Sequence, residues 1–190
     1  ILTEQFRRHA WLPVVRFRRN LRGIARDFEA IERTKEEKIK VGIVGEIYVK
    51  YSSMGNNHLE QFLLGQGCEV DVPGLMGFLS YCVEVRIDDI NLYGGSRFAR
   101  WVLRRAMDVV THFERVIAKA IRKNSGYRPA EPFRVAKSHL NGLIGLGCKM
   151  GEGWLLPAEM IELIESGVTN IVCVQPFGCL PNHIVGKGPI

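Results

Sequence analysis

Apolar runs alternate with amphipathic segments along residues 38–190, a pattern typical of an α/β domain. Predicted strands lie at residues 39–46, 68–72 and 170–174. Predicted helices lie at residues 97–123 and from about Pro157 to just before Gly167, and a shorter one, capped by Asn56 or Asn57, reaches to about Leu64. Because strands and helices alternate, we expect an open, mostly parallel sheet with helices on both faces.

The N-terminal residues carry a different pattern. Residues 3–37 are expected to be helical, with a possible break at Leu12-Pro13, and the segment becomes strongly charged from Phe28 onward. We therefore predict two parts, a basic helical arm or connector at residues 1–37 and an α/β domain at residues 38–190. The chain begins with Ile1 and ends where another helix is expected to start, so we expect a fragment of a longer polypeptide.

The net charge of +6 is concentrated near the N-terminus of the 190-residue chain. Residues 1–26 hold seven arginines and one glutamate, whereas the remaining residues balance 19 basic against 19 acidic side chains. One interpretation is a nucleic-acid-binding arm. The favoured one is an arm whose arginines meet acidic or phosphate groups elsewhere in the parent protein, because no recognition motif or stacking aromatic pattern accompanies them. Nucleic acid is therefore not the expected partner.

Composition also bears on the cellular setting. No apolar stretch approaches the roughly 20 residues of a membrane-spanning helix, and no secretory signal opens the chain. The five cysteines are odd in number and form no CxxC pair, which argues against a secreted disulfide framework. We therefore expect a cytoplasmic protein that does not bind membranes.

Polar side chains with useful chemistry follow the predicted strands. The candidate ligand-binding residues are Glu46, Tyr48, Ser52, Asn56, Asn57 and His183. Because the carboxyl ends of parallel strands share one edge of a sheet, we expect these segments to converge there. The Gly55-Asn56-Asn57 turn can present backbone N–H groups to an anion, although it is neither a dinucleotide-binding fingerprint nor a Walker loop. No catalytic residue is assigned.

The five cysteines differ in their surroundings. Cys173 lies inside an apolar strand and Cys68 at the start of another, so we predict packing roles for both. Cys179 lies in a loop bounded by glycine and proline and is predicted to be a metal ligand or redox group, with Cys82 and Cys148 as further candidates. No compact four-ligand zinc spacing is present. For His183, a ligand or proton-donor role and a helix-capping role both stay open.

Four stretches carry a family resemblance, namely residues 41–52, the Gly55-Asn56-Asn57 turn, residues 151–156 and residues 174–183. They resemble the large CoA-substrate-specific enzyme activases, whose C-terminal part is similar to the 2-hydroxyacyl-CoA dehydratases. The resemblance covers about residues 38–190. It implies a Rossmann-like fold and an iron–sulfur cluster of the 4Fe–4S type held by cysteines from two such domains. It also implies a CoA thioester bound nearby and a separate ATP-driven electron donor.

By this resemblance, Cys179 corresponds to a cysteine ligand of the second dehydratase domain. Such a cluster takes four thiolates. The other ligands and the ATPase domain, with its ATP or ADP, would then lie in missing N-terminal domains, so the chain alone is expected to be apo and inactive.

Two functions follow from these observations. The first is half of a cluster-binding, dehydratase-like module of anaerobic metabolism. The alternative is a nucleotide- or CoA-binding interaction module coupled to an ATPase domain, and a structural scaffold is a third reading. The sequence leaves open whether the chain forms a homo-oligomer.

Overall fold

The computed structural model describes residues 14–33, 36–140 and 142–188. The chain divides into two compact units. Unit 1 comprises residues 1–35 and 112–131, and unit 2 comprises residues 36–111 and 132–190. The division near residue 36 adjoins the domain border predicted after residue 37, but the assignment of residues 112–131 to unit 1 has no counterpart in the sequence pattern. The helix expected over residues 3–13 and the helix expected to start at the C-terminus fall largely outside the described residues.

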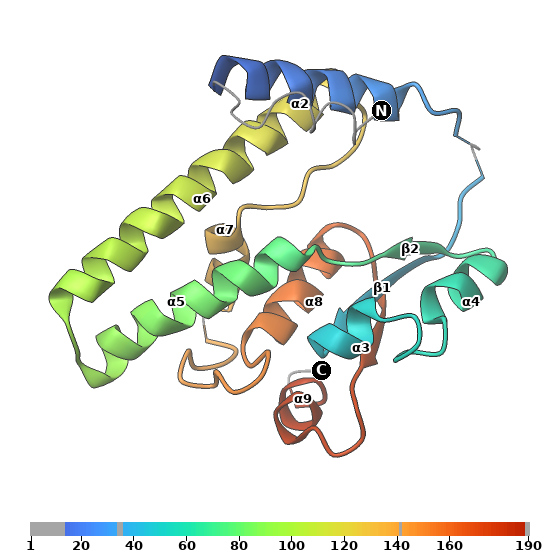
Figure 1. Cartoon of the computed structure of the whole chain (residues 1–190). Helices are drawn as coiled ribbons and strands as arrows, with labels where there is room; N and C mark the ends of the chain where they lie inside the picture. The colour runs from blue at the N-terminus through green and yellow to red at the C-terminus, as the bar shows by residue number, and fades with distance from the viewer. Residues whose placement is uncertain (1–13, 34–35, 141, 189–190) are drawn as a thin grey trace. The chain divides into compact units, whose positions relative to one another are not determined.

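A parallel sheet of three strands lies in unit 2 (Figure 1). The strands are β1 (Lys40–Gly45), β2 (Glu69–Asp71) and β3 (Asn170–Val174). Their order is β2-β1-β3, and β1 pairs with β3 from Val41↔Asn170 to Gly45↔Val174. The mixed α/β class, the open parallel sheet and the positions of all three strands are confirmed. β1 was readily predicted because it is buried from Val41 onward and therefore apolar throughout.

Helices occupy most of the remaining chain. In unit 2 they are α3 (Ile47–Tyr51), α4 (Leu59–Gly65), α5 (Leu75–Tyr93), α7 (Phe133–Ser138), α8 (Leu155–Glu165) and α9 (Leu180–Val185). Helix α6 (Arg97–Asn124) begins in unit 2 and continues into unit 1. The predicted helices correspond to α4, α6 and α8, but the helix expected up to residue 37 ends at Glu29, and residues 30–33 and 36–37 of the charged segment are not helical. Helix α5 was not predicted, because its buried positions include polar residues such as Glu84 and Asp88 and no clear apolar stripe marks it.

The core of unit 2 forms on two sides of α8. Trp154, just before this helix, is fully buried and packs edge-on against Tyr81 with 4.8 Å between ring centroids. Leu156 and Leu163 of α8 instead pack in a second cluster with Val44 of β1. Because α8 belongs to both clusters, it anchors the sheet to the helical part of unit 2.

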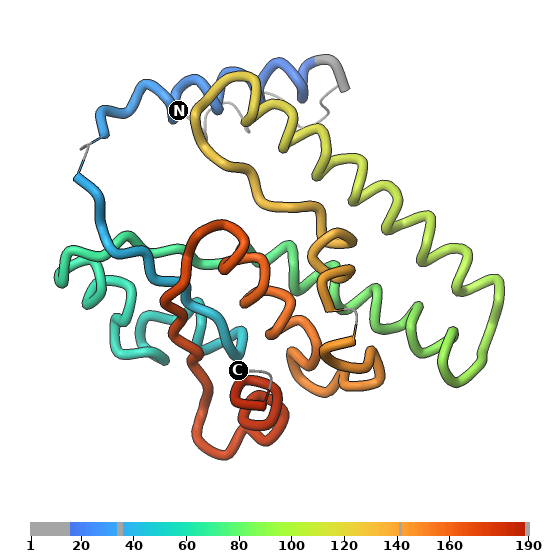
Figure 2. The backbone as a smooth tube through the Cα atoms, turned by 180° about the vertical axis from the view of Figure 1, so that it is seen from behind, coloured from blue at the N-terminus to red at the C-terminus, as the bar shows by residue number. Residues whose placement is uncertain are grey.

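Unit 1 is built from α2 (Val14–Glu29) and the C-terminal half of α6, which lie close together in both views (Figure 2). Phe17 packs edge-on against Phe113, with ring centroids 5.5 Å apart. Toward the other end, the Glu29 carboxylate accepts a 2.7 Å hydrogen bond from the backbone N–H of Gly126. These two contacts show that α2 and this part of α6 run in the same direction.

Candidate functional site

The polypeptide turns sharply as it leaves β1. The backbone N–H of Glu46 donates to the Val174 carbonyl of β3 at 2.9 Å, and the Glu46 carboxylate accepts from Val49 N–H at 2.8 Å. A second carboxylate, that of Glu152, accepts from Ile47 N–H at 3.0 Å. The N–H groups that open α3 are therefore bound by carboxylates of the chain itself. Glu46, predicted as a ligand-binding residue, serves as the N-cap of α3.

The predicted anion-binding turn after α3 is held by its own side chains. Asn56 donates to the Val49 carbonyl at 2.9 Å and accepts from Leu59 N–H at 3.1 Å. Ser52 Oγ accepts from Gly55 N–H at 3.2 Å. Asn57 adopts a left-handed backbone, with φ of 54°. Asn56 and Ser52 thus order the turn. The N-cap position of α4 is His58, not Asn56 or Asn57 as predicted, because the left-handed turn moves the start of the helix to Leu59. Tyr48 is exposed beside this turn.

A buried ion pair lies close to the carboxyl edge of the sheet. Lys50 of α3 donates to both carboxylate oxygens of Glu159 of α8, at 2.8 and 3.0 Å. Both side chains are almost fully buried, with 3% and 6% exposure. The Lys50 ammonium also lies 5.0 Å from the ring centroid of Tyr51, whose hydroxyl donates to the Pro73 carbonyl at 2.6 Å. This pair joins the segment after β1 to the central helix of the core.

Burial governs the electrostatics of this pair. Burial raises the pKa of Glu159, and the attraction of Lys50 opposes the rise without cancelling it. Burial and then the Glu159 carboxylate also raise the pKa of the Cys173 thiol. Cys173 is therefore disfavoured as a thiolate, in keeping with the packing role predicted for it.

Sequence reasoning missed both members of the pair. Neither Lys50 nor Glu159 is among the candidate residues that the sequence pattern indicated. A signal was present, because Glu159 lies three residues after Leu156 and four before Leu163, on the apolar face of α8. A carboxylate on such a face indicates a buried partner.

Cys179 lies in the loop that leaves β3, at the same edge of the sheet. It is partly exposed and occupies the N-cap position of α9, after Gly178 with φ of +76° and a fully exposed Phe177. The exposed His183 follows one turn later, and its Nδ1 lies 3.1 Å from Gln175 Nε2. The loop thus brings the predicted thiol and imidazole to neighbouring positions, with the histidine already paired to a neighbouring amide.

Cys82 and Cys148 come from distant segments but lie near one tyrosine. Both thiols are exposed, Cys82 on α5 and Cys148 in the loop before α8. The buried Tyr81 hydroxyl donates to the Lys149 carbonyl at 2.7 Å. Burial first, and then the negative charge of the Glu152 carboxylate, raises the pKa of Tyr81. The two cysteines are therefore neighbours of the same buried hydroxyl.

The loop that carries Cys148 also approaches α9. A Cβ atom at Gly151 would lie 3.4 Å from Pro181 Cβ and 3.5 Å from Asn182 Oδ1. Asn182 is fully buried, and neither polar atom of its side chain has a hydrogen-bond partner within the described residues. This loop therefore connects the surroundings of Cys82 with the helix that Cys179 caps.

Cysteine thiols are the right type of ligand for an iron–sulfur cluster, but too few of them lie together in the described residues. Within residues 14–33, 36–140 and 142–188, no cysteine belongs to a group of three or more His, Cys, Asp or Glu side chains that could hold a metal ion together. A cluster that takes four thiolates would thus need ligands from elsewhere.

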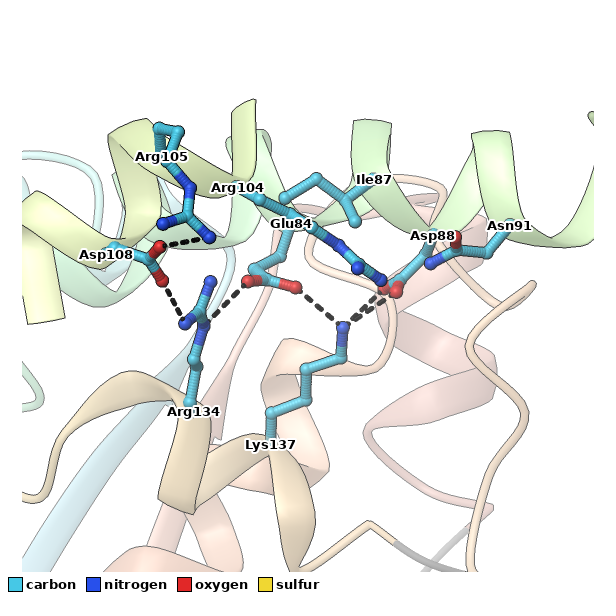
Figure 3. Close-up of a pocket in the computed structure, with 9 residues that line it drawn as sticks. All are labelled: Glu84, Ile87, Asp88, Asn91, Arg104, Arg105, Asp108, Arg134 and Lys137. Carbon is cyan, nitrogen blue, oxygen red and sulfur yellow. Dashed lines mark hydrogen bonds and ion pairs between the residues drawn. The ribbon is translucent and has the colours of Figure 1, made fainter. Parts of the chain in front are cut away.

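A separate pocket of about 380 Å³ lies between α5, α7 and the unit 2 part of α6 (Figure 3). Lys137 reaches from α7 to Glu84 at 2.9 Å and to Asp88 at 2.7 Å, and Arg134 bridges Asp108 at 2.8 Å and Glu84 at 3.3 Å. Burial raises the pKa of Asp88 despite the Lys137 hydrogen bond, whereas the hydrogen bond from Arg134 lowers that of Asp108. These groups satisfy one another, so we assign the network to the attachment of α7.

No helix in the described part of the chain is long and apolar enough to cross a membrane. Comparisons with protein-family models, with curated proteins and with solved structures find no match to this chain.

Proposed function

We propose that unit 2 is a Rossmann-like, cysteine-donating half of an iron–sulfur cluster module of the 2-hydroxyacyl-CoA dehydratase or activase type. The observation that carries this proposal is the position of Cys179. Its thiol is partly exposed at the edge where β1 and β3 end, in a loop that also exposes Phe177. A second domain can reach a thiol in this position, and thiolates are the normal ligands of such clusters.

Cys82 and Cys148 are the further ligand candidates. Both are exposed, and the loop of Cys148 contacts α9 next to Cys179. In this proposal the remaining ligands come from N-terminal domains of a longer polypeptide, the substrate is a CoA thioester, and an ATP-driven donor supplies the electron. The five free cysteines agree with a reducing cytoplasm.

The Cys179→Ala variant of the longer polypeptide tests the proposal. We expect iron and acid-labile sulfide to fall together after purification without oxygen, because one thiolate of the cluster is lost. The matched control is Cys68→Ala, since Cys68 precedes β2 at the amino end of the sheet. Iron and sulfide contents that equal those of the control would show that Cys179 holds no cluster.

A second function, nucleotide or CoA binding without a cluster, is favoured by a different observation. A pocket of about 220 Å³ lies beside the ends of β1 and β2, lined by Tyr51, Ser53 and Asn56 among others. In that case acetyl-CoA or ADP, at about 100-fold excess over Kd, should stabilise the 190-residue chain by about 2.7 kcal/mol. Thermal unfolding measures the effect, and an unchanged Tm with both ligands speaks against this function.

A further inference from the structure

A basic groove lies within unit 1, apart from all the candidates above. It has a volume of about 430 Å³ and is formed by α2 and the C-terminal half of α6. Its lining comprises Arg18, Arg22, His112, Arg115, Val116, Lys119, Ala120, Lys123 and Asn124. Five of these side chains are permanent cations, and none is a carboxylate. We call this feature the basic groove.

The cations are stacked along both helices. On α6, Arg115, Lys119 and Lys123 follow one another at intervals of four residues, and Arg18 and Arg22 of α2 have the same spacing. Like charges at this spacing repel one another and weaken a helix. Among the described residues, none of the five forms an ion pair with a carboxylate. The repulsion is thus not relieved within this part of the chain, which is the arrangement of a site for a negatively charged ligand.

The division into units makes this concentration of charge clearer. Unit 1 contains fourteen lysines and arginines against six acidic residues, whereas unit 2 contains twelve against fourteen. The basic character therefore extends beyond the N-terminal arm to residues 112–131, and it belongs to unit 1 alone. A focused positive potential of this kind attracts anions.

The shape and floor of the basic groove indicate the size of the ligand. Val116 and Ala120, both half-buried, form an apolar floor between the cations. The volume falls within the range of small-molecule sites, about 300–1,000 Å³. The residues that line it include no Phe, Tyr or Trp that could stack on bases, as single-stranded nucleic acid sites do. A compact ligand with several negative charges fits these features better than an extended polyanion.

We propose that the basic groove binds a small molecule carrying a chain of phosphate groups, of the diphosphate or triphosphate class. Guanidinium groups form paired hydrogen bonds with phosphate oxygens. Arg22 and Arg115 provide one such group from each wall, and Lys119 and Lys123 add point charges. This inference is independent of the proposed cluster, because the groove lies in unit 1 and the cysteines lie in unit 2.

Binding of inorganic tripolyphosphate to the 190-residue chain, measured by isothermal titration calorimetry, tests the proposal. We compare Arg22→Gln/Arg115→Gln with Arg19→Gln/Arg122→Gln. Each pair removes one arginine from each helix, but Arg19 and Arg122 are exposed residues outside the groove lining. The groove variant should raise Kd about tenfold or more, since charge-assisted contacts are lost. The control should change it by about twofold at most, because only distant charge is removed.

Further measurements identify the source of the phosphates and the class of ligand. Tighter binding of ATP than of tripolyphosphate would indicate a nucleotide that also uses the apolar floor, whereas equal affinity would indicate recognition of the phosphate chain alone. Circular dichroism of both variants shows whether the helices persist. Equal losses in the two variants, no tripolyphosphate binding by the parent chain, or tighter binding of random-sequence DNA than of either small ligand would overturn the proposal.

Discussion

Lys50→Met is expected to destabilise unit 2 by about 3–5 kcal/mol, because it leaves the Glu159 carboxylate buried without its cation. The double variant Lys50→Met/Glu159→Leu should recover most of this loss, since apolar residues can replace a buried pair at little cost. Urea unfolding followed by circular dichroism measures both changes. A double variant as unstable as the single one would show that Lys50 contributes chiefly through packing.

The loss in Lys50→Met should also depend on pH. Burial already raises the pKa of Glu159 in the folded chain, and removal of Lys50 takes away the interaction that opposes the rise. A carboxyl whose folded pKa is raised contributes stability that is fully present below its unfolded pKa of about 4.3 and lost as the pH rises through its folded pKa. The deficit of Lys50→Met relative to the parent should therefore be smaller at pH 4.5 than at pH 7.5, and equal deficits would exclude this origin.

Gly45→Ala is the second change for which we expect a large effect. Gly45 has φ of +134°, and an added Cβ atom would overlap the Val174 carbonyl oxygen. That carbonyl accepts the N–H of Glu46, so relief of the overlap requires separation of β1 from β3. Backbone strain and overpacking each cost about 1–3 kcal/mol, which gives an expected loss of about 2–6 kcal/mol.

Gly77→Ala is the matched control for Gly45→Ala. Gly77 lies in α5, and an added Cβ would meet no atom within 4 Å. This substitution should stabilise the chain by about 0.5–1 kcal/mol, because alanine favours helix. Urea unfolding of the two variants side by side separates the local geometry of Gly45 from a general effect of added methyl groups. A loss below about 1 kcal/mol in Gly45→Ala would contradict the close approach of the strands.

The candidate site could be predicted only in outline. The positions of Glu46 and Cys179 after strands placed both at the carboxyl edge of the sheet, and the structure has them there. The local hydrogen bonds of Glu46 and Asn56 could not be predicted from the sequence, because they depend on the conformation of the turn that these side chains hold. The approach of the Cys148 loop to α9 depends on contacts between distant segments, and these contacts cannot be predicted from the spacing of residues in the sequence.

The sequence is sufficient to predict those helices and strands whose hydrophobic pattern is local. β1 is buried on both faces and is therefore apolar throughout, whereas α6 is buried on one face and is therefore amphipathic. Both patterns can be recognised from residues two to four positions apart in the sequence. Helix α5 was not predicted, because its polar residues Glu84 and Asp88 are buried. Their ion-pair partner, Lys137, lies about fifty residues later in the sequence.

The two features with the most specific chemistry form only through tertiary packing. Lys50 and Glu159 are 109 positions apart, and only the packing of α8 against the sheet pairs them. The walls of the basic groove come from residues 18–22 and 112–124, so its positive charge becomes concentrated only when α2 lies beside α6. Local pattern reports which faces are buried, whereas electrostatic pairing depends on which distant faces meet, and that is set by the packing of the whole unit.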